Sequence, residues 1–395
     1  MHIIIDGTTT QDQFAYAGVG QCTKNLILSL VKNHPNTQYS ILLFENKDSL
    51  IEPEINKYEN AKIERTGKFR KNDYKNDIWY FFQILPKINK IKQKDSIYFC
   101  PYFWRNFPAF SMPTILFVHD MNLALFNMYS QQSIFHNIIR GVQYWVTLYK
   151  AKRCRYIITN SETTKRDFLS YFPKYPEEKI TVSHLASDLE MEEADLSDIL
   201  PKDYKDKGYI IYMGGGINKT KNTEGVIRGY SEFLKLLNPN ENAPYLVIAG
   251  TIFIDKSKKE VRGFNRLIQA LGIKDKVVFT GFYKDEQKYS LLINSFAFIH
   301  LSAYEGFGIA PLEAVLAETP CIIHRSNVYQ EVFKDMAIFV NGENSVEVGK
   351  TIYDVYKNQE KYKKITEKAY KLSKKYDWRK TGDTIHEVFE RLRIP

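Results

Sequence analysis

What the sequence lacks narrows the range of proteins that it can encode. No apolar run in its 395 residues approaches the ~18–20 residues that a bilayer-spanning helix needs. The first residues hold no basic segment and no cleavage site, so we expect no signal peptide. Only four cysteines are present and none forms a CxxC pair, which argues against a zinc site or a disulfide framework. The expected location is the cytoplasm.

Several catalytic signatures are also missing. The chain has no HExxH, no P-loop lysine signature and no GxSxG. No DxD pair lies on an obvious loop, where it would hold a divalent metal beside a diphosphate. These absences leave several common chemistries poorly supported.

The composition is that of an ordinary globular protein, with 44% hydrophobic and 26% charged residues. Domains hold roughly 100–200 residues, so the length predicts two domains, each large enough for its own core.

The net charge of +9 is unevenly distributed. Between Lys62 and Arg105 eleven Lys and Arg stand against four Asp and Glu, and between Arg140 and Arg166 seven stand against one. Such patches attract nucleic acid, anionic lipid or phosphorylated ligands. A chain rich in Lys, Asn, Ile and Tyr throughout explains them equally well, so both interpretations stay open.

Short apolar runs alternate with segments of helical spacing along the whole chain. Apolar side chains recur at helical spacing from Val19 to Val31, and the hydroxyl of Ser161 is placed to cap another helix. This alternation predicts parallel sheets covered on both faces, in two doubly wound α/β domains that face a cleft. Ligands in such sheets bind beyond the carboxyl ends of the strands. The predicted strands are His2–Asp6, Tyr39–Glu45, Ser96–Cys100, Thr114–His119, Tyr156–Thr159, Lys179–Ser183, Tyr209–Met213, Tyr245–Ala249, Lys276–Thr280, Phe296–His300, Pro320–Ile323 and Ala337–Val340.

An acidic, irregular stretch divides the chain near its middle. We assign residues 1–187 to a first Rossmann-like domain and 188–207 to a linker. Residues 208–375 form the second Rossmann-like domain in this interpretation, and 376–395 form a C-terminal helix that crosses back to the first.

The stretch YEGFGIAPLEA, residues 304–314, follows a predicted strand and runs into a helix predicted from Pro311. Free backbone N–H groups and the helix dipole favour an anion at such a point. Gly306 and Gly308 let the backbone approach that anion closely, and proline suits a first helical turn. A diphosphate fits this loop.

Carboxylates stand on both sides of the same loop, at Glu305 and Glu313. They would repel a phosphate, so we expect them to accept hydrogen bonds from hydroxyl groups instead. A nucleotide sugar has that arrangement, with ribose hydroxyls, a diphosphate and sugar hydroxyls in succession.

The sequence HLSAYEGFGIAPLEAVLAETPCII resembles the signature of glycosyltransferase family 4, which consists of retaining GT-B enzymes. The resemblance covers nearly the whole chain and is specific in the C-terminal half. It implies that Glu305 faces the donor sugar and that Glu313 binds ribose. The backbone expected to meet the diphosphate and the sugar is that of Gly306, Phe307, Gly308 and Ile309.

A lysine-bearing loop, GGGINKTKN at residues 214–222, resembles a second family motif. Lys221 matches the family, whereas the position before it commonly holds Arg and here holds Thr220. Lys219 is the candidate for that cationic role, although an ammonium is not equivalent to a guanidinium fork. The lysines would stabilise the charge that develops on the departing diphosphate. Donor binding is also assigned to Gly215, Gly216 and Asn222.

In the first domain, YAGVGQCTKNLILSL resembles the family's glycine loop and brings Gly18 and Gly20 near the donor phosphates or the acceptor. His119 ends a predicted strand, where side chains point into the cleft. The resemblance places it against the hydroxyls of the donor sugar. Asp120 is expected to orient it on the acceptor side.

The resemblance implies transfer of a sugar from a nucleoside-diphosphate sugar to a hydroxyl of a glycan or lipid-linked polysaccharide precursor, with retention. The first domain would hold the acceptor and the second the donor, whose base would lie beside Gly281 and Phe282. The lysine loop looks most like members that use GDP-mannose, so mannose is favoured. The missing DxD pair agrees with the metal-independent GT-B type. We expect no bound cofactor, no metal and no nucleic-acid partner.

Alternatives remain at this point. They are a UDP- or dTDP-sugar-dependent transferase, a GT-B sugar-nucleotide epimerase, and a non-catalytic binder of sugar nucleotides or nucleic acid. Asp77–Phe82 and Val142–Lys150 set aromatic side chains beside lysines, as segments at an anionic membrane surface do. Amphipathic helices that pack their aromatic residues into the core explain the two segments equally well.

Overall fold

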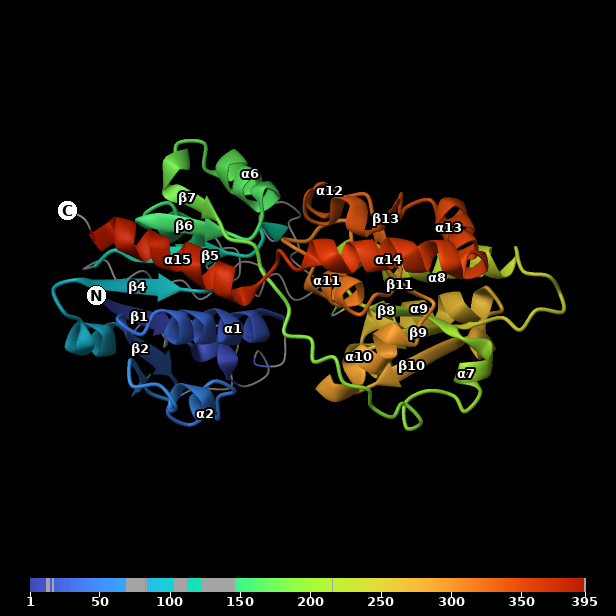
Figure 1. The fold of residues 1–395 in the computed structure, drawn as a ribbon, viewed down its shortest axis with the longest axis horizontal. Coiled ribbons are helices and arrows are strands. Elements are labelled where there is room, and N and C mark those ends of the chain that lie inside the picture. Colours follow the sequence, from blue (N-terminus) through green and yellow to red (C-terminus); the bar gives the residue numbers. More distant parts are fainter. Residues whose placement is uncertain are drawn as a thin grey trace. The chain divides into compact units, whose positions relative to one another are not determined.

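The computed structural model describes residues 1–11, 15, 18–68, 82, 84–102, 112–122, 146–214 and 216–393. The chain forms two compact units (Figure 1). The first unit combines Met1–Ala186 with Tyr376–Pro395, and the second is the continuous stretch Ser187–Lys375.

The described part of the first unit contains a seven-stranded parallel sheet in the order β3-β2-β1-β4-β5-β6-β7. The central strands β1 and β4 are buried along their whole length, as their sequences HIIID and SIYFC favour. The strands are β1 (His2–Asp6), β2 (Gln38–Leu43), β3 (Ala61–Arg65), β4 (Ser96–Cys100), β5 (Thr114–Val118), β6 (Tyr156–Thr159) and β7 (Ile180–Val182).

The end of the chain packs against its beginning within the first unit. Helix α15 (Trp378–Arg393) contacts helix α1 (Gly18–Asn33), and the hydroxyl of Ser29 donates a 2.5 Å hydrogen bond to the carbonyl of Trp378. The other helices of this unit within the described ranges include α2 (Glu52–Ile55) and α6 (Glu162–Tyr171).

At the start of α6, Ser161 accepts a 3.0 Å hydrogen bond from the backbone N–H of Thr164. The predicted cap is therefore confirmed.

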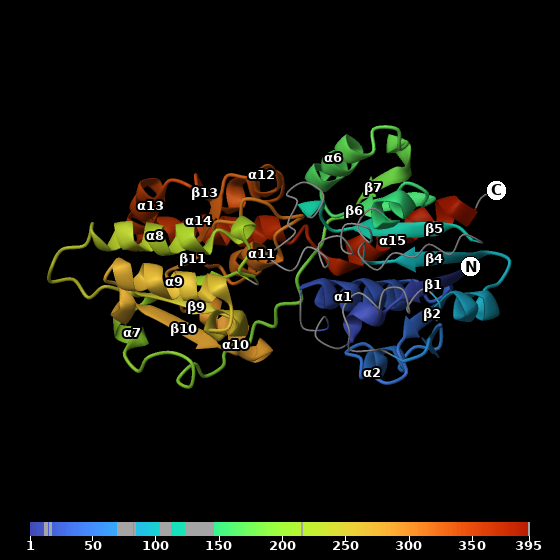
Figure 2. The same cartoon turned by 180° about the vertical axis from the view of Figure 1, so that it is seen from behind.

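The second unit contains a six-stranded parallel sheet in the order β10-β9-β8-β11-β12-β13, as far as the structure describes it. Because parallel crossovers are right-handed, α8 and α9 cover one face (Figure 2), whereas α10, α11 and α14 cover the other (Figure 1). All strands end at one edge, where the loops that carry the motifs begin.

The bounds of this unit's elements follow. The strands are β8 (Tyr209–Met213), β9 (Tyr245–Ala249), β10 (Val277–Gly281), β11 (Ala297–His300), β12 (Cys321–His324) and β13 (Ile338–Val340). The helices are α7 (Tyr204–Lys207), α8 (Thr223–Leu234), α9 (Lys259–Ala270), α10 (Asp285–Ile293), α11 (Ile309–Leu316), α12 (Asn327–Phe333), α13 (Ser345–Lys357) and α14 (Gln359–Ser373).

Residues 188–207, expected as a linker, are part of the second unit. The backbone N–H of Ala194 donates to the hydroxyl of Ser290 over 2.7 Å. The amide of Gln287 donates to the carbonyl of Asp195 over 2.9 Å. These contacts hold the acidic stretch against α10.

One observed strand has no counterpart in the sequence-based prediction, and several others differ from it by one or two residues at their ends. β3 was not predicted, because it lies at the edge of its sheet and its sequence AKIER is polar and only partly buried. An edge strand needs no apolar surface on both faces, so it lacks the apolar run by which the other strands were found.

Some predictions lie outside the described residues. Gly215 is one of them, as are residues 77–81 and 142–145 of the segments considered for membrane contact. Within the described ranges no helix is both long enough and apolar enough to cross a bilayer.

A close helix crossing in the second unit gives a test of the packing. An added Cβ at Gly349 of α13 would lie 2.6 Å from the Cβ of Glu232 and 2.8 Å from the backbone nitrogen of Phe233, both in α8. Gly349→Ala should therefore lower the free energy of unfolding by about 1–3 kcal/mol, because α13 must move away from α8.

The same substitution at Gly263 of α9 is the matched control. A Cβ there meets nothing within 4 Å, so Gly263→Ala should stabilise by up to about 1 kcal/mol through helix propensity. Thermal and urea unfolding of both variants measure the difference. Equal effects at the two positions would contradict the described crossing.

Candidate functional site

The predicted diphosphate loop joins β11 to α11. Helix α11 begins at Ile309, two residues before the predicted Pro311, so the proline lies third in the first turn, where no N–H partner is needed. Gly308 caps the helix with φ of +105°, and an added Cβ would lie 2.8 Å from the ring of Tyr329. Only glycine suits this position, because other residues rarely adopt that backbone conformation and would meet the aromatic ring.

Three side chains meet at Glu305. Its Oε1 lies 2.5 Å from the Nζ of Lys221, which belongs to the 3₁₀ turn η5 (Lys219–Lys221), and 3.3 Å from the Nε2 of His300. The side chains of Glu305 and Lys221 are 20% and 21% exposed, so the pair is shielded but reachable.

Electrostatics keep this carboxyl group ionised. Burial alone would raise the pKa of Glu305, but the charge of Lys221 and the hydrogen bond from His300 outweigh it and hold the pKa well below its ordinary value. Burial lowers the pKa of His300 despite the neighbouring carboxylate. A neutral His300 still donates its Nε2 proton to Glu305.

The two loops that carry this cluster are joined through their backbones. The N–H of Ala303 donates to the carbonyl of Thr220 over 2.7 Å, and the hydroxyl of Ser302 donates to the same carbonyl over 3.0 Å. Thr220 immediately precedes Lys221, so these bonds hold the lysine opposite Glu305.

Asn222 also connects loops at this edge of the sheet. It adopts the left-handed conformation with φ of +50°, and its Oδ1 accepts from the N–H of Gly225 at the start of α8. Its Nδ2 donates over 2.9 Å to the carbonyl of Gly342 beyond β13. The asparagine therefore joins η5 to a third loop at this edge.

Glu313 occupies a different environment. It is 8% exposed on α11, and its Oε1 lies 3.1 Å from the Nζ of Lys288 on α10. Burial raises the pKa of Glu313 above its ordinary value although Lys288 opposes the shift. The two carboxylates of the motif are thus tuned in opposite directions.

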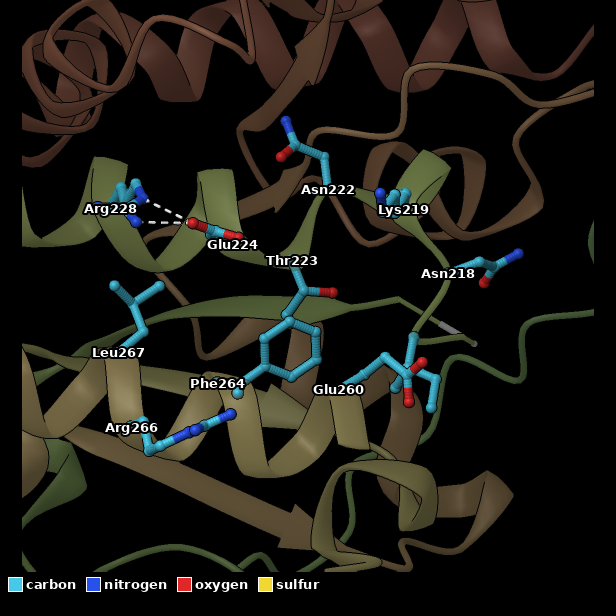
Figure 3. Close-up of a pocket in the computed structure, with 12 residues that line it drawn as sticks. Asn218, Lys219, Asn222, Thr223, Glu224, Arg228, Glu260, Phe264, Arg266 and Leu267 are labelled. Carbon is cyan, nitrogen blue, oxygen red and sulfur yellow. Dashed lines mark hydrogen bonds and ion pairs between the residues drawn. The ribbon is translucent and has the colours of Figure 1, made fainter. Parts of the chain in front are cut away.

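Lys219 does not join Lys221 at Glu305. It is exposed on η5, its side chain makes no hydrogen bond or ion pair with any described residue, and it lines a pocket between α8 and α9 (Figure 3). The structure therefore brings only one of the two predicted catalytic lysines to the carboxylate.

The remaining second-unit residues lie at the same edge of the sheet. Gly281 ends β10 with φ of +68°, and Phe282 after it is 69% exposed. Gly216, Gly306 and Phe307 are buried, and Ile309 is half-buried.

The first unit holds the other predicted residues. His119 follows β5, and its Nε2 lies 2.7 Å from the carbonyl of Pro101. Burial lowers the pKa of His119 to about 4, with the carbonyl opposing, so the ring is neutral at pH 7. Asp120 accepts from the N–H of Asn122 over 2.9 Å. Gly18 and Gly20, expected in a loop, lie in the first turn of α1.

Sequence reasoning missed His300 and Lys288. His300 is the last residue of β11, and the strand-end rule that selected His119 applies to it equally. No sequence signal marks Lys288, because its partner lies 25 residues away on another helix. Among the described residues no group of three or more His, Cys, Asp or Glu is placed to hold a metal ion.

The cluster around Glu305 predicts a pH-dependent contribution to stability. Lys221→Met leaves a largely desolvated carboxylate without its charge partner, which should cost roughly 1–3 kcal/mol at neutral pH. The depressed pKa of Glu305 makes the wild-type pair stabilising above the unfolded-state pKa of about 4.3. The difference in free energy of unfolding between wild type and Lys221→Met should therefore narrow as pH falls through that value toward the lower pKa of Glu305 in the folded protein.

Thermal unfolding across the acidic-to-neutral range measures this difference. Lys219→Met, which removes an exposed lysine without a partner from the same turn, should leave the melting temperature unchanged. A gap between wild type and Lys221→Met that stays constant with pH would contradict the assignment.

Comparison with known proteins finds one matching family model and several similar sequences. Residues 198–372 match the model of the family described as glycosyl transferases group 1. The O-antigen chain mannosyltransferase RfbU of Salmonella typhimurium is 25% identical over 193 residues, covering 49% of this chain and 48% of RfbU. The serotype-specific mannosyltransferase WbdA of Escherichia coli is 22% identical over 428 aligned residues, covering 99% of this chain and 48% of WbdA. The chain thus spans about half the length of these curated relatives.

Solved structures share the fold. Anabaena HepE, crystallised with UDP and glucose, superposes with a TM-score of 0.71 at 15% identity, covering 99% of this chain and 100% of HepE. WaaG, a glycosyltransferase involved in lipopolysaccharide biosynthesis, gives 0.67 at 12% identity and covers 98% of this chain and 99% of WaaG. The predicted fold class is confirmed: the chain consists of two parallel-sheet α/β units, as in GT-B glycosyltransferases.

Proposed function

We propose that this protein is a glycosyltransferase of the family 4 type. It moves a sugar, with mannose favoured, from a nucleoside-diphosphate sugar to a hydroxyl of a glycan or lipid-linked polysaccharide precursor. Transfer retains the anomeric configuration and needs no metal. The family match of the second unit and the two mannosyltransferase relatives support this proposal.

The observation that carries the proposal is the cluster of Glu305, Lys221 and His300 beside the glycine-bearing start of α11. Unpaired N–H groups at a helix start attract a diphosphate, and the lysine adds a positive charge on one side. Glu313 lies inside the same helix, and in the proposal it accepts from hydroxyls on the other side of that diphosphate.

Each group has a distinct task in this proposal. Lysine has three N–H donors, so the bond from Lys221 to Glu305 leaves two for an oxygen of the departing diphosphate. Glu305, ionised by its surroundings, accepts from sugar hydroxyls and stabilises positive charge on the sugar ring as the bond to the leaving group lengthens. The diphosphate accepts the proton of the acceptor hydroxyl on the same face of the sugar.

His119 contributes one acceptor in this scheme. A carbonyl oxygen only accepts, so the Nε2 that faces Pro101 carries the proton. The neutral ring then has Nδ1 as its free acceptor for a hydroxyl of the donor sugar. In the proposal Asp120 belongs to the acceptor side, and Gly18 and Gly20 at the start of α1 lie near the donor phosphates or the acceptor.

The donor base is the least constrained part. Gly281, the last residue of β10, and the exposed Phe282 after it lie at the same edge. In the proposal they belong to the base-side loop. The lysine loop and the mannosyltransferase relatives favour GDP-mannose. The HepE structures contain UDP and UDP-glucose, so a uridine donor is the second candidate.

The functional test separates binding from chemistry. Thermal unfolding is followed with GDP, UDP and dTDP and with GDP-mannose, UDP-glucose and a dTDP-sugar, and donor cleavage is assayed with the same sugars. One nucleotide should raise the melting temperature, and the rise should grow with the concentration of that nucleotide. Glu313→Gln should lower the affinity for that nucleotide about tenfold or more, because a charged hydrogen bond to ribose is lost.

Glu305→Gln should keep nucleotide binding but slow sugar transfer on the order of 100- to 1,000-fold, as removal of one transition-state contact does elsewhere. Nuclear magnetic resonance of the product reports the anomeric configuration. The proposal fails if no nucleotide raises the melting temperature, or if both substitutions leave binding and transfer intact.

Lys288 sets the pH range of nucleotide binding in this scheme. Ribose hydroxyls donate to ionised Glu313, so affinity is present above the raised pKa of that carboxyl and is lost as pH falls through it. Lys288→Met removes the positive charge that opposes the rise in the pKa of Glu313. The loss of nucleotide affinity should therefore move to higher pH by about one unit or more.

Titration calorimetry of the bound nucleotide against pH measures this shift. Lys284→Met removes an exposed lysine at the start of the same helix and is the matched control. Identical pH profiles for wild type and Lys288→Met would show that the lysine does not tune Glu313.

A further inference from the structure

A pocket of about 630 Å³ lies between α8 and α9 in the second unit (Figure 3). These helices cover the face of the sheet opposite to α10 and α11, which carry Lys288 and Glu313. Apart from Lys219 and Asn222 in the shared η5 region, no residue assigned to the donor site lines the pocket. Its volume falls within the roughly 300–1,000 Å³ of small-ligand sites.

The pocket has an apolar lining. Phe264 and Leu267 of α9 and Ile217 of the lysine loop are only partly buried against the core of the unit. In Figure 3 the ring of Phe264 lies in the space between the two helices, with Leu267 on one side and Glu260 on the other. An aromatic face is therefore available to a ligand.

Charged side chains of both signs surround this lining. Lys219, Glu260 and Arg266 come from two separate elements, and none of their side chains makes a hydrogen bond or ion pair with any described residue. Arg228 and Glu224 also line the pocket and pair with each other at 2.7 and 3.0 Å. The rim therefore offers unpaired donors and an unpaired carboxylate acceptor around one aromatic ring.

We propose that this pocket binds a neutral oligosaccharide, as a holding site separate from the donor site. The identity of the ligand rests on the proposed function, in which the substrate and product are glycans. Each sugar hydroxyl both donates and accepts, which matches a rim with both ammonium or guanidinium and carboxylate groups. The apolar faces of sugar rings match Phe264 and Leu267.

Other ligand classes fit this rim less well. A phosphate would meet the carboxylates of Glu224 and Glu260 beside the cations. An apolar ligand would desolvate three unpaired charges without compensation. A glycan held here would lie beside η5, the turn that also supplies Lys221 to the Glu305 cluster.

The experiment uses the full chain without a sugar nucleotide. Phe264→Trp keeps an aromatic face and places a fluorophore in the pocket, and its emission is compared with that of wild type. The probes are mannotriose, maltotriose and cellotriose, with mannose 6-phosphate and GMP as charged comparisons. A saturable change of emission with at least one trisaccharide, and with neither charged probe, is the expected result.

Two further substitutions in the Phe264→Trp background test the pocket itself. Arg266→Ala should lower the affinity for the trisaccharide about tenfold or more, because a charge-assisted hydrogen bond is lost. Gly263→Leu should abolish binding, because Gly263 lines the pocket and an added Cβ meets nothing within 4 Å. Lys259→Ala removes an exposed lysine of α9 outside the lining and should change nothing.

The outcomes separate this inference from the proposed function. If no trisaccharide changes the emission, or if binding survives both Arg266→Ala and Gly263→Leu, the oligosaccharide site is disproved even where nucleotides still raise the melting temperature. Preferential binding of GMP or mannose 6-phosphate would overturn it as well. Failure of every nucleotide to bind refutes the donor site alone, because the fluorescence result stands without it.

Discussion

The ion pair between Glu305 and Lys221 is the interaction on which the geometry of the second unit's loop edge depends. The two residues are 84 positions apart in the sequence, yet the parallel sheet places their loops at one edge, after β8 and β11. The hydrogen bonds of Ser302 and Ala303 to the Thr220 carbonyl hold the two loops in register. His300, at the end of β11, is the second hydrogen-bonding partner of the carboxylate, beside the lysine.

Glu305 and Glu313 carry the same carboxyl group, but their surroundings shift its pKa in opposite directions. Glu305 has two hydrogen-bonding partners and a pKa pushed down, whereas Glu313 is more deeply buried with one lysine and a pKa pushed up. Glu305 is consequently a permanent charge, suited to stabilising a developing cation. Glu313 is closer to a change of protonation, so its usefulness as an acceptor depends on Lys288. The spacing in sequence does not reveal this difference.

The sequence was sufficient where local chemistry decides the structure. The strands Ser96–Cys100, Tyr156–Thr159 and Tyr209–Met213 have their predicted bounds because each is a short apolar run buried on both faces. Strand β3 was missed because its edge position tolerates polar residues.

The site was predictable only in part, for a related reason. The glycine and glutamate spacing located the loop before α11, and the helix start at Ile309 was missed by two residues. Which lysine reaches Glu305 depends on the turn η5, which brings Lys221 to the carboxylate, whereas Lys219 is exposed and lines the pocket between α8 and α9. Lys288 depends on the packing of α10 against α11. Such contacts between distant segments follow from the fold and not from any neighbouring residue.

The second unit interrupts the first, and this ordering affects synthesis on the ribosome. Ser187–Lys375 is continuous, so it can fold as soon as it has emerged. The first unit begins to emerge earlier but receives α15 only after the whole of the second unit has been synthesised. Ile385, Val388 and Phe389 of that helix are fully buried in the finished protein. Until they arrive, the apolar surface that they cover is open to chaperones, so of the two units the one that is started first is completed second.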